Sequence, residues 1–256
     1  MTRSQDLIFG VNPVFEKLKA SSGDVIEIYV SEIANRSALR QITREAARRG
    51  VRVVAAEPKF LDQLVGKQRH QGVVARTEGF RYLPFAALLQ RIASSSIAER
   101  ILILDGVTDP RNFGALLRTA EAAGVRHVVI PKDRSVAVTP LVAKASAGAA
   151  YLLDISKVTN LRRAIAAIKE HGYWIAGLEA SKGESLYQRS FPARLAMVLG
   201  SEGTGVRPIN LKECDFLISI PMLGKVQSLN VSVAGAVVLY ELLRQSSEPQ
   251  PKLARS

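Results

Sequence analysis

Short apolar runs alternate with amphipathic stretches along most of the chain. Strands and helices that alternate in this way favour an α/β fold with a mainly parallel sheet. In the first part of the chain, apolar runs at residues 26–30, 51–55 and 71–78 predict strands. Residues 38–49 have the spacing of a helix that Gly50 can end.

The pattern weakens after residue 80 and restarts at residue 101. A short helical stretch and three serines at residues 94–96 indicate a linker between the two parts. Further strands are predicted at residues 101–104, 127–130, 151–155, 173–178, 195–200 and 216–220, with helices at 113–124, 139–149 and 158–171. We therefore predict domains at residues 1–80 and 99–245, a linker at 81–98 and a disordered tail at 246–256.

Charge and composition narrow the class of partner. The 256 residues are 47% hydrophobic, which is enough for a core, and carry a formal net charge of +12. This excess favours an anionic partner and leaves RNA, DNA and an acidic membrane surface open. Cys214 is the only cysteine, so a disulfide within the chain is excluded and a reducing compartment is expected.

The remaining composition predicts a soluble cytoplasmic protein with no metal. The sequence has no apolar run of signal-peptide or transmembrane length, so no membrane association is expected. The three histidines are scattered and lack a second cysteine nearby, a pattern that disfavours a zinc site.

Four arginines recur at every fourth position in the first predicted domain: Arg36, Arg40, Arg44 and Arg48. On a helix they share one face, where like charges repel by roughly 0.2–0.5 kcal/mol per pair. Contacts with RNA or DNA phosphates explain this stripe better than a solvated helix face, which stays as the alternative. In the same interpretation Lys67, Arg69 and His70 extend the basic surface.

Three polar loops that contain glycine follow predicted strands of the second domain. They lie in residues 105–124, 199–206 and 220–242, and in an open parallel sheet such loops form a ligand pocket. The stretch GSEGTG reverses the dinucleotide fingerprint, and no G-x-x-x-x-G-K-[ST] occurs. These patterns alone predict an α/β enzyme with an unusual cofactor loop.

The three loops carry a resemblance to a known family. The stretches DPRNFGALLRTAEAAG, LGSEGTGV and IPMLGKVQSLNVSVAGAVVLYEL resemble motifs one, two and three of the SpoU (TrmH-type) RNA ribose methyltransferases, in the same order. The first domain resembles that family's substrate-binding domain, which is similar to ribosomal protein L30e. The resemblance implies a C-terminal α/β SPOUT domain with a deep trefoil knot, S-adenosylmethionine as cofactor and a homodimer through the C-terminal domain.

The resemblance also implies an activity. It is S-adenosylmethionine-dependent methylation of the ribose 2′-hydroxyl of a guanosine in 23S (large-subunit) rRNA, in the peptidyl-transferase P-loop. A tRNA guanosine or an rRNA adenosine as target remains open, as does a non-catalytic, ribosome-associated RNA-binding protein. Affinity for S-adenosylmethionine would separate the enzymes from the last class.

Site residues are carried over from the same motifs. The expected catalytic residues are Asn112, Arg118, Glu202, Ser228 and Asn230, and the expected cofactor contacts are Gly200, Ile220 and Leu229. Arg118 would activate the hydroxyl; since arginine hardly ever deprotonates, it could instead hold a phosphate and stabilise oxyanion charge.

Plainer roles stay open for the polar site residues. Asn112 could be an N-cap, and Ser228 and Asn230 could cap the final helix. Glu202 could be a turn residue or the partner of an arginine. Glu121 is expected to support Arg118.

Overall fold

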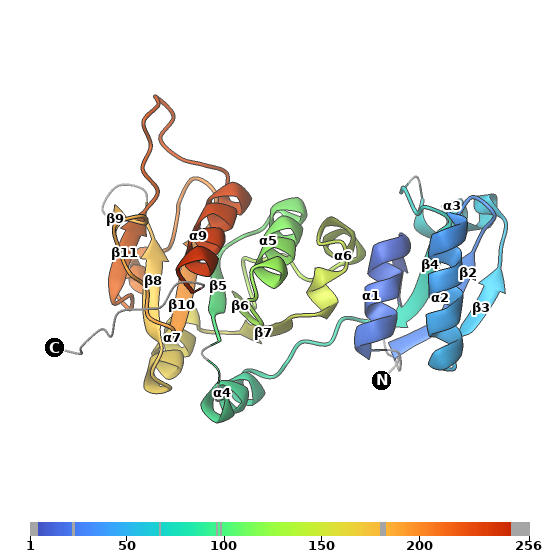
Figure 1. The fold of residues 1–256 in the computed structure, drawn as a ribbon, viewed down its shortest axis with the longest axis horizontal. Coiled ribbons are helices and arrows are strands. Elements are labelled where there is room, and N and C mark those ends of the chain that lie inside the picture. The colour runs from blue at the N-terminus through green and yellow to red at the C-terminus, as the bar shows by residue number, and fades with distance from the viewer. Residues whose placement is uncertain are drawn as a thin grey trace. The chain divides into compact units, whose positions relative to one another are not determined.

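The computed structural model describes residues 5–21, 24–66, 68–95, 97, 99–179 and 183–246 (Figure 1). The chain divides into two compact units. Unit 1 comprises Met1–Arg81 and Ala137–Leu152, and unit 2 comprises Tyr82–Val136 and Leu153–Ser256. Lys67, Ser96 and the predicted tail beyond Ser246 lie outside the described residues. In the part of the chain described, no helix is long and apolar enough to cross a membrane.

Unit 1 is built on a mixed four-stranded sheet with the order β1-β4-β2-β3. Strand β4 is antiparallel to both β1 and β2, whereas β2 and β3 are parallel. Its elements are β1 (Gln5–Phe9), α1 (Val11–Ser21), β2 (Val25–Val30), α2 (Arg36–Arg48), β3 (Arg52–Ala55), α3 (Pro58–Val65), β4 (Val73–Glu78), α6 (Pro140–Ala145) and the 3₁₀ turn η2 (Ala149–Tyr151).

Helix α2 shows why the predicted amphipathic pattern forms a helix here. The Asn35 side chain caps its start by accepting hydrogen bonds from the backbone N–H groups of Ser37 and Ala38. Ile42 and Ala46 are fully buried in the core of unit 1. The opposite face, which carries the arginines, is exposed.

Unit 2 contains a seven-stranded sheet with the order β7-β6-β5-β10-β8-β11-β9, and every pairing is parallel. This confirms the predicted α/β class with a mainly parallel sheet. Its elements are α4 (Phe85–Ser94), β5 (Ile101–Asp105), α5 (Pro110–Ala122), β6 (His127–Pro131), β7 (Asp154–Val158), α7 (Leu161–Glu170), β8 (Trp174–Leu178), β9 (Glu184–Ser185), β10 (Leu195–Gly200), α8 (Pro208–Leu211), β11 (Phe216–Ser219) and α9 (Val231–Ser246).

The predicted elements differ most from the structure between β6 and β7. The expected helix over residues 139–149 ends at Ala145, and Gly148, with φ 93°, starts the turn η2. The expected strand at residues 151–155 is wrong in its limits, because β7 begins only at Asp154. An apolar run does not distinguish a strand from a buried turn when its periodicity is weak.

The segment predicted as a linker contains helix α4. Leu88 and Ile92 of this helix are fully buried in the core of unit 2. The serines that suggested a linker come at the end of this helix. The break in the hydrophobic pattern at these serines therefore marks the end of α4.

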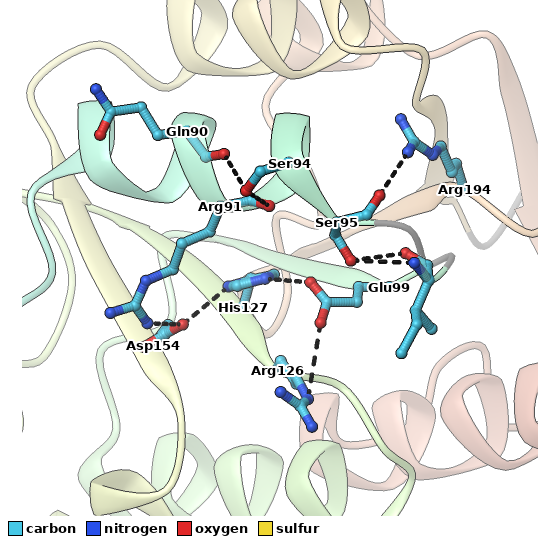
Figure 2. Close-up of polar contacts among 10 residues, drawn as sticks. Gln90, Arg91, Ser94, Ser95, Glu99, Arg126, His127, Asp154 and Arg194 are labelled. Carbon is cyan, nitrogen blue, oxygen red and sulfur yellow. Dashed lines mark hydrogen bonds and ion pairs between the residues drawn. The ribbon is translucent and has the colours of Figure 1, made fainter.

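An ionic network around the buried His127 joins α4 to the amino-terminal ends of three neighbouring strands (Figure 2). His127, the first residue of β6, lies between two carboxylates: its Nε2 is 2.8 Å from Glu99 Oε2, and its Nδ1 is 3.3 Å from Asp154 Oδ2. Arg91 of α4 contacts Asp154 at 2.5 Å. The network lies at the strand ends opposite to the loops that carry the predicted site.

Candidate active site

The three predicted loops begin at the carboxyl ends of strands of the same sheet. Strands β5 and β10 are paired so that Asp105 and Gly200 lie side by side at their ends. The third loop leaves β11 and leads into α9, which packs against α5 (Figure 1). Loops that leave adjacent parallel strands at one edge form the usual ligand crevice of an open α/β sheet.

A hydrogen-bonded cluster joins one polar residue from each loop. Asn112 donates from Nδ2 to Glu202 Oε1 at 2.8 Å. Asn230 donates from Nδ2 to Asn112 Oδ1 at 3.1 Å and also to Glu202 Oε1. Asn112 and Asn230, which are 90 and 28 positions from Glu202 in the sequence, therefore hold its carboxylate in place.

The interpretation of Asn112 as an N-cap is wrong. Asp109 caps α5, because its carboxylate accepts hydrogen bonds from the N–H groups of Arg111 at 2.9 Å and Asn112 at 2.8 Å. The amide side chain of Asn112 is thereby free to bind Glu202. An Asp directly before a Pro at the first helical position is the better sequence signal for a cap.

The capping role of Asn230 is confirmed. Its Oδ1 accepts hydrogen bonds from the N–H groups of Ser232 at 2.9 Å and Val233 at 3.4 Å at the start of α9. Because its Nδ2 donates to the cluster, this side chain both caps the helix and holds Glu202. Ser228, in contrast, caps no helix in the described structure and lies exposed in the preceding loop.

A cavity of about 370 Å³ opens beside the cluster. Six of the predicted site residues line it: Gly200, Glu202, Ile220, Ser228, Leu229 and Asn230. Apolar walls come from Leu178, Leu199 and Met222, and the backbone of residues 200–205 supplies polar groups. An apolar cavity of this size with a few placed polar groups suits a small molecule.

Gly200 is required by close packing. A Cβ atom at this position would lie 1.8 Å from the carbonyl carbon of Gly205, so no other residue fits. Ser201 and Gly205 pair as an isolated antiparallel bridge, and Gly203 and Gly205 have φ values of 83° and 65°. Glycine adopts this left-handed backbone without the steric penalty of other residues.

The buried Asp105, which none of the sequence motifs predicted as a site residue, anchors the Glu202 loop. Its carboxylate is fully buried and accepts hydrogen bonds from Arg207 N at 2.9 Å, Arg207 Nε at 2.7 Å and Asn210 Nδ2 at 2.7 Å. A buried carboxylate is stable only when it is paired and hydrogen-bonded in this way. The signal available was an aspartate that ends an otherwise apolar strand.

Arg118 and Glu121 are not brought into the cavity. Both lie on α5, six and nine residues after Asn112, and neither lines the cavity. The Arg118 side chain is exposed and has no hydrogen-bond or ion-pair partner among the described residues. Within a single chain, the expected support of Arg118 by Glu121 is not seen.

The stripe of arginines on α2 lies on the exposed face of unit 1. Arg48 forms an ion pair with Glu45 at 3.2 Å. Arg36, Arg40 and Arg44 form no ion pair with any residue that the structure describes, and they border a shallow hollow beside Phe15. Three unpaired cations on one face are available to an external anion.

Cys214 is not a candidate nucleophile. Burial raises the pKa of its thiol to about 12, and the nearby Asp215 adds to this shift. The thiolate, which is the reactive form, is therefore scarce at neutral pH.

Comparison with known proteins identifies the family. The sequence model of the SpoU rRNA Methylase family matches residues 99–240, and a model described as RNA 2′-O ribose methyltransferase substrate binding matches residues 7–83. The chain belongs to the SpoU rRNA methylase family. The match covers all three loops of the candidate site.

Relatives and solved structures agree with this membership. The chain is 40% identical over 243 residues to the 23S rRNA (guanosine-2′-O-)-methyltransferase RlmB of Shewanella oneidensis, covering 95% of this chain and 98% of that protein. It is 42% identical over 245 residues to RlmB of Coxiella burnetii, covering 95% and 97%. The fold is similar to the SpoU methyltransferase AviRb from Streptomyces viridochromogenes, crystallised with AdoMet, with a TM-score of 0.77, 22% identity and coverage of 95% and 91%.

The cavity fits S-adenosylmethionine as the cofactor. Its glycine-rich side admits close approach of a ligand to the backbone of residues 200–205, because no side chain stands in the way at the glycines. Ile220 and Leu229 offer apolar contact, and Glu179 and Glu202 offer carboxylates that suit a cationic sulfonium or amine.

Proposed function

We propose that this chain is an S-adenosylmethionine-dependent RNA methyltransferase that methylates the ribose 2′-hydroxyl of a guanosine in 23S rRNA. The observation that carries the proposal is the cluster of Asn112, Glu202 and Asn230 at the rim of a cofactor-sized cavity. Relatives at about 40% identity over almost the whole chain bear the name of this activity. The membership of the SpoU rRNA methylase family supports the same chemistry.

The reaction requires an aligned nucleophile and a route for one proton. Bound in the cavity, the cofactor supplies an activated methyl group, whose bond to sulfur breaks as the ribose oxygen bonds to its carbon. Positioning the hydroxyl in line with this methyl contributes several kcal/mol, up to about 7–11 for near-ideal orientation. The hydroxyl proton must leave during the same step.

We assign the cluster residues to positioning of the ribose. Asn112 and Asn230 hold the Glu202 carboxylate, and Asn230 is itself fixed as the cap of α9. Ser228, exposed at the cavity edge, is placed to contact the ribose from the other loop. Gly200, Ile220 and Leu229 are assigned to the cofactor.

We assign Arg118 to the charge that develops on the ribose oxygen or to the adjacent phosphate. Its guanidinium is exposed and unpaired among the residues that the structure describes, and it suits an anion better than the abstraction of a proton, because arginine keeps its charge at neutral pH. Since Arg118 does not line the cavity of its own chain, its contribution requires the RNA, a second chain, or both.

A homodimer through the C-terminal domain is part of the proposal. On α9, Val233 is 49% exposed and Tyr240 is 52% exposed, and their spacing of seven residues places them on one face. In the loop before α9, Leu223 and Val226 are also exposed. An apolar face of this kind suits burial against a copy of itself by two-fold symmetry.

The finer features of the fold belong to the same proposal. By the family resemblance, the segment from β11 to α9 threads through a loop to form a deep trefoil knot, and residues 1–80 form an L30e-like RNA-binding domain. The family model for RNA substrate binding, which matches residues 7–83, supports this role for the first domain. We further propose that the target guanosine lies in the peptidyl-transferase P-loop and that the enzyme acts in the cytoplasm without a metal.

Methyl transfer from labelled S-adenosylmethionine to rRNA tests the function. The acceptor is large-subunit rRNA from cells that lack the protein, and the modified nucleotide is mapped by its resistance to alkaline cleavage. We expect one 2′-O-methylguanosine in 23S rRNA. Methylation of tRNA or of an rRNA adenosine would replace the proposed substrate, and absence of cofactor binding by calorimetry would favour a non-catalytic RNA-binding protein.

A further inference from the structure

Unit 1 contains a second hollow that the proposed reaction does not use. It has a volume of about 320 Å³ and lies at the start of α1. Its lining includes Gly10, Asn12, Arg69, Gln71, Lys144 and Ala147. None of the described residues that line it is an aspartate or a glutamate, so its charge is positive only.

The two cations of this hollow lie close together without a carboxylate. Lys144 donates from Nζ to the backbone carbonyl of Arg69 at 2.7 Å and lies 4.9 Å from the centroid of the Phe9 ring. Burial, and then the charge of Arg69, lower the pKa of Lys144. The exposed Arg69 guanidinium has no partner in the described chain. An anion between these groups would relieve their mutual repulsion.

The walls of the hollow are fixed by local structure. Gln71 accepts a hydrogen bond from Val11 N at 3.2 Å through Oε1, although its φ of 55° is rare for a residue with a side chain. Ala147 on the other segment also has a positive φ, of 51°. The buried His70 accepts a hydrogen bond from Gly72 N at 3.1 Å through Nδ1. The site is therefore largely formed before a ligand binds.

Asn12 adds neutral donors to the two cations. It lies in the first turn of α1, where the helix carries partial positive charge. Its side-chain amide is exposed and has no partner among the described residues. Two cations with an amide donor and a helix start are the groups that bind phosphate.

The position of the hollow favours a phosphate within a polymer. Asn12 of this hollow and Phe15 of the hollow beside the α2 arginines lie three residues apart on α1, and hence on the same face. Two positive hollows that adjoin one helix face suit successive phosphates of one strand. A free anion would need only one of them.

We infer that the hollow formed by Asn12, Arg69 and Lys144 binds a backbone phosphate of the RNA substrate. The inference rests on the proposed function, which supplies RNA as the ligand. Arg69 and Lys144 contact the same phosphate, so they act as one site. The contact positions the RNA without reading its sequence.

The test measures RNA affinity of the full-length chain against salt concentration. Arg69→Gln, Lys144→Gln and the double variant are compared with Lys59→Gln, which removes the same charge from an exposed lysine of unit 1 outside the hollow. Each lost phosphate contact lowers the slope of log affinity against log salt by about 0.7 for a single strand. We expect each single variant and the double variant to lose about 0.7, since both cations are needed to hold the one phosphate, and Lys59→Gln to match the wild type. Folding of Lys144→Gln is checked by its unfolding midpoint, and Arg69→Gln, whose side chain is unpartnered, tests the site independently.

Two results would overturn the inference. The first is that both single variants keep the salt slope of Lys59→Gln. The second is that the salt slope of the double variant falls by about 1.4, which indicates two independent surface charges. Binding of inorganic phosphate in the hollow that leaves RNA affinity unchanged at constant ionic strength would assign the hollow to a free anion instead. Methyl transfer is measured on the same samples: wild-type protein that binds RNA without methylating it refutes the proposed function alone, and failure to bind RNA refutes both.

Discussion

Asn230 illustrates how one side chain can serve two purposes at the residue scale. Its Oδ1 caps α9, while its Nδ2 donates to Asn112 and Glu202. The two functions use different atoms, so they can be separated by substitution. Serine retains an oxygen that caps a helix but has no amide donor.

We predict different effects for two substitutions of Asn230. Asn230→Ser should keep the free energy of unfolding within about 0.5 kcal/mol of the wild type, whereas Asn230→Ala should lose about 1 kcal/mol with the cap. Both should lower the rate of methyl transfer, because both release Glu202. Urea unfolding and single-turnover methylation check this pair. Full activity in Asn230→Ser would show that the cluster has no part in the reaction.

The role of Arg118 is a second prediction at the residue scale. We expect Arg118→Ala to lower kcat by about 10²–10³, the usual effect of removing one group that stabilises an oxyanion, with unchanged cofactor affinity and stability. The matched control is Arg163→Ala, since Arg163 is an exposed helical arginine of the same unit, on α7. Equal activity of the two variants would remove Arg118 from the proposed mechanism.

At the scale of elements, the His127 network connects helix α4 with the amino-terminal ends of neighbouring strands in unit 2 (Figure 2). Burial acts to lower the pKa of His127, but the hydrogen bonds to Asp154 and Glu99 outweigh it and the net shift is upward. For Asp154, burial acts to raise the pKa, and its contacts with His127 and Arg91 produce a net lowering. The charged forms of both groups are therefore favoured in the folded state.

The sign of the pH dependence follows from these shifts. A histidine whose pKa is raised on folding contributes full stability below its unfolded value of about 6.5, and this is lost as the pH rises through the higher folded value. An aspartate whose pKa is lowered contributes full stability above about 3.9, and this is lost as the pH falls through the lower folded value. The network should stabilise unit 2 most between about pH 4 and 6.5.

We expect the free energy of unfolding to decrease from pH 6.5 towards pH 8.5 and His127→Gln to flatten this dependence. The measurement is urea unfolding at several pH values, with His171→Gln as the control because His171 lies on the surface end of α7 and contacts only backbone through its ring. If His127→Gln leaves the pH dependence of the free energy of unfolding unchanged, a group other than His127 causes that dependence.

At the scale of the whole molecule, RNA affinity and chemistry are assigned to different units. The unpaired arginines lie on α2 of unit 1, and the cavity with its polar cluster lies in unit 2. A basic surface on a unit that does not contain the reacting atoms can raise the local concentration of RNA without selecting a sequence. The proposed assignment of RNA binding to unit 1 and of chemistry to unit 2 can therefore be tested by substitutions in either unit.

Substitution of Arg36, Arg40 and Arg44 by glutamine should act on RNA binding alone. We expect the salt dependence of RNA affinity to become shallower by about 2, from roughly 0.7 for each of three contacts, while calorimetry shows unchanged affinity for S-adenosylmethionine. KM for RNA should rise, and kcat at saturating RNA should change little. An unaltered salt slope would make the stripe a solvated helix face.

The sequence by itself determined the α/β class, the order of most elements and the three motifs, because hydrophobic periodicity and glycine placement are local properties. The family resemblance of its motifs also named six of the residues that line the cavity. The tertiary structure decided what depends on contacts between distant segments. Asp105 and Arg207, 102 residues apart, form an anchor that no spacing indicates, and the Asn112 amide bonds to Glu202, which lies 90 residues away in the sequence. The hollow at Arg69 and Lys144 likewise exists only because two segments 75 residues apart meet in unit 1.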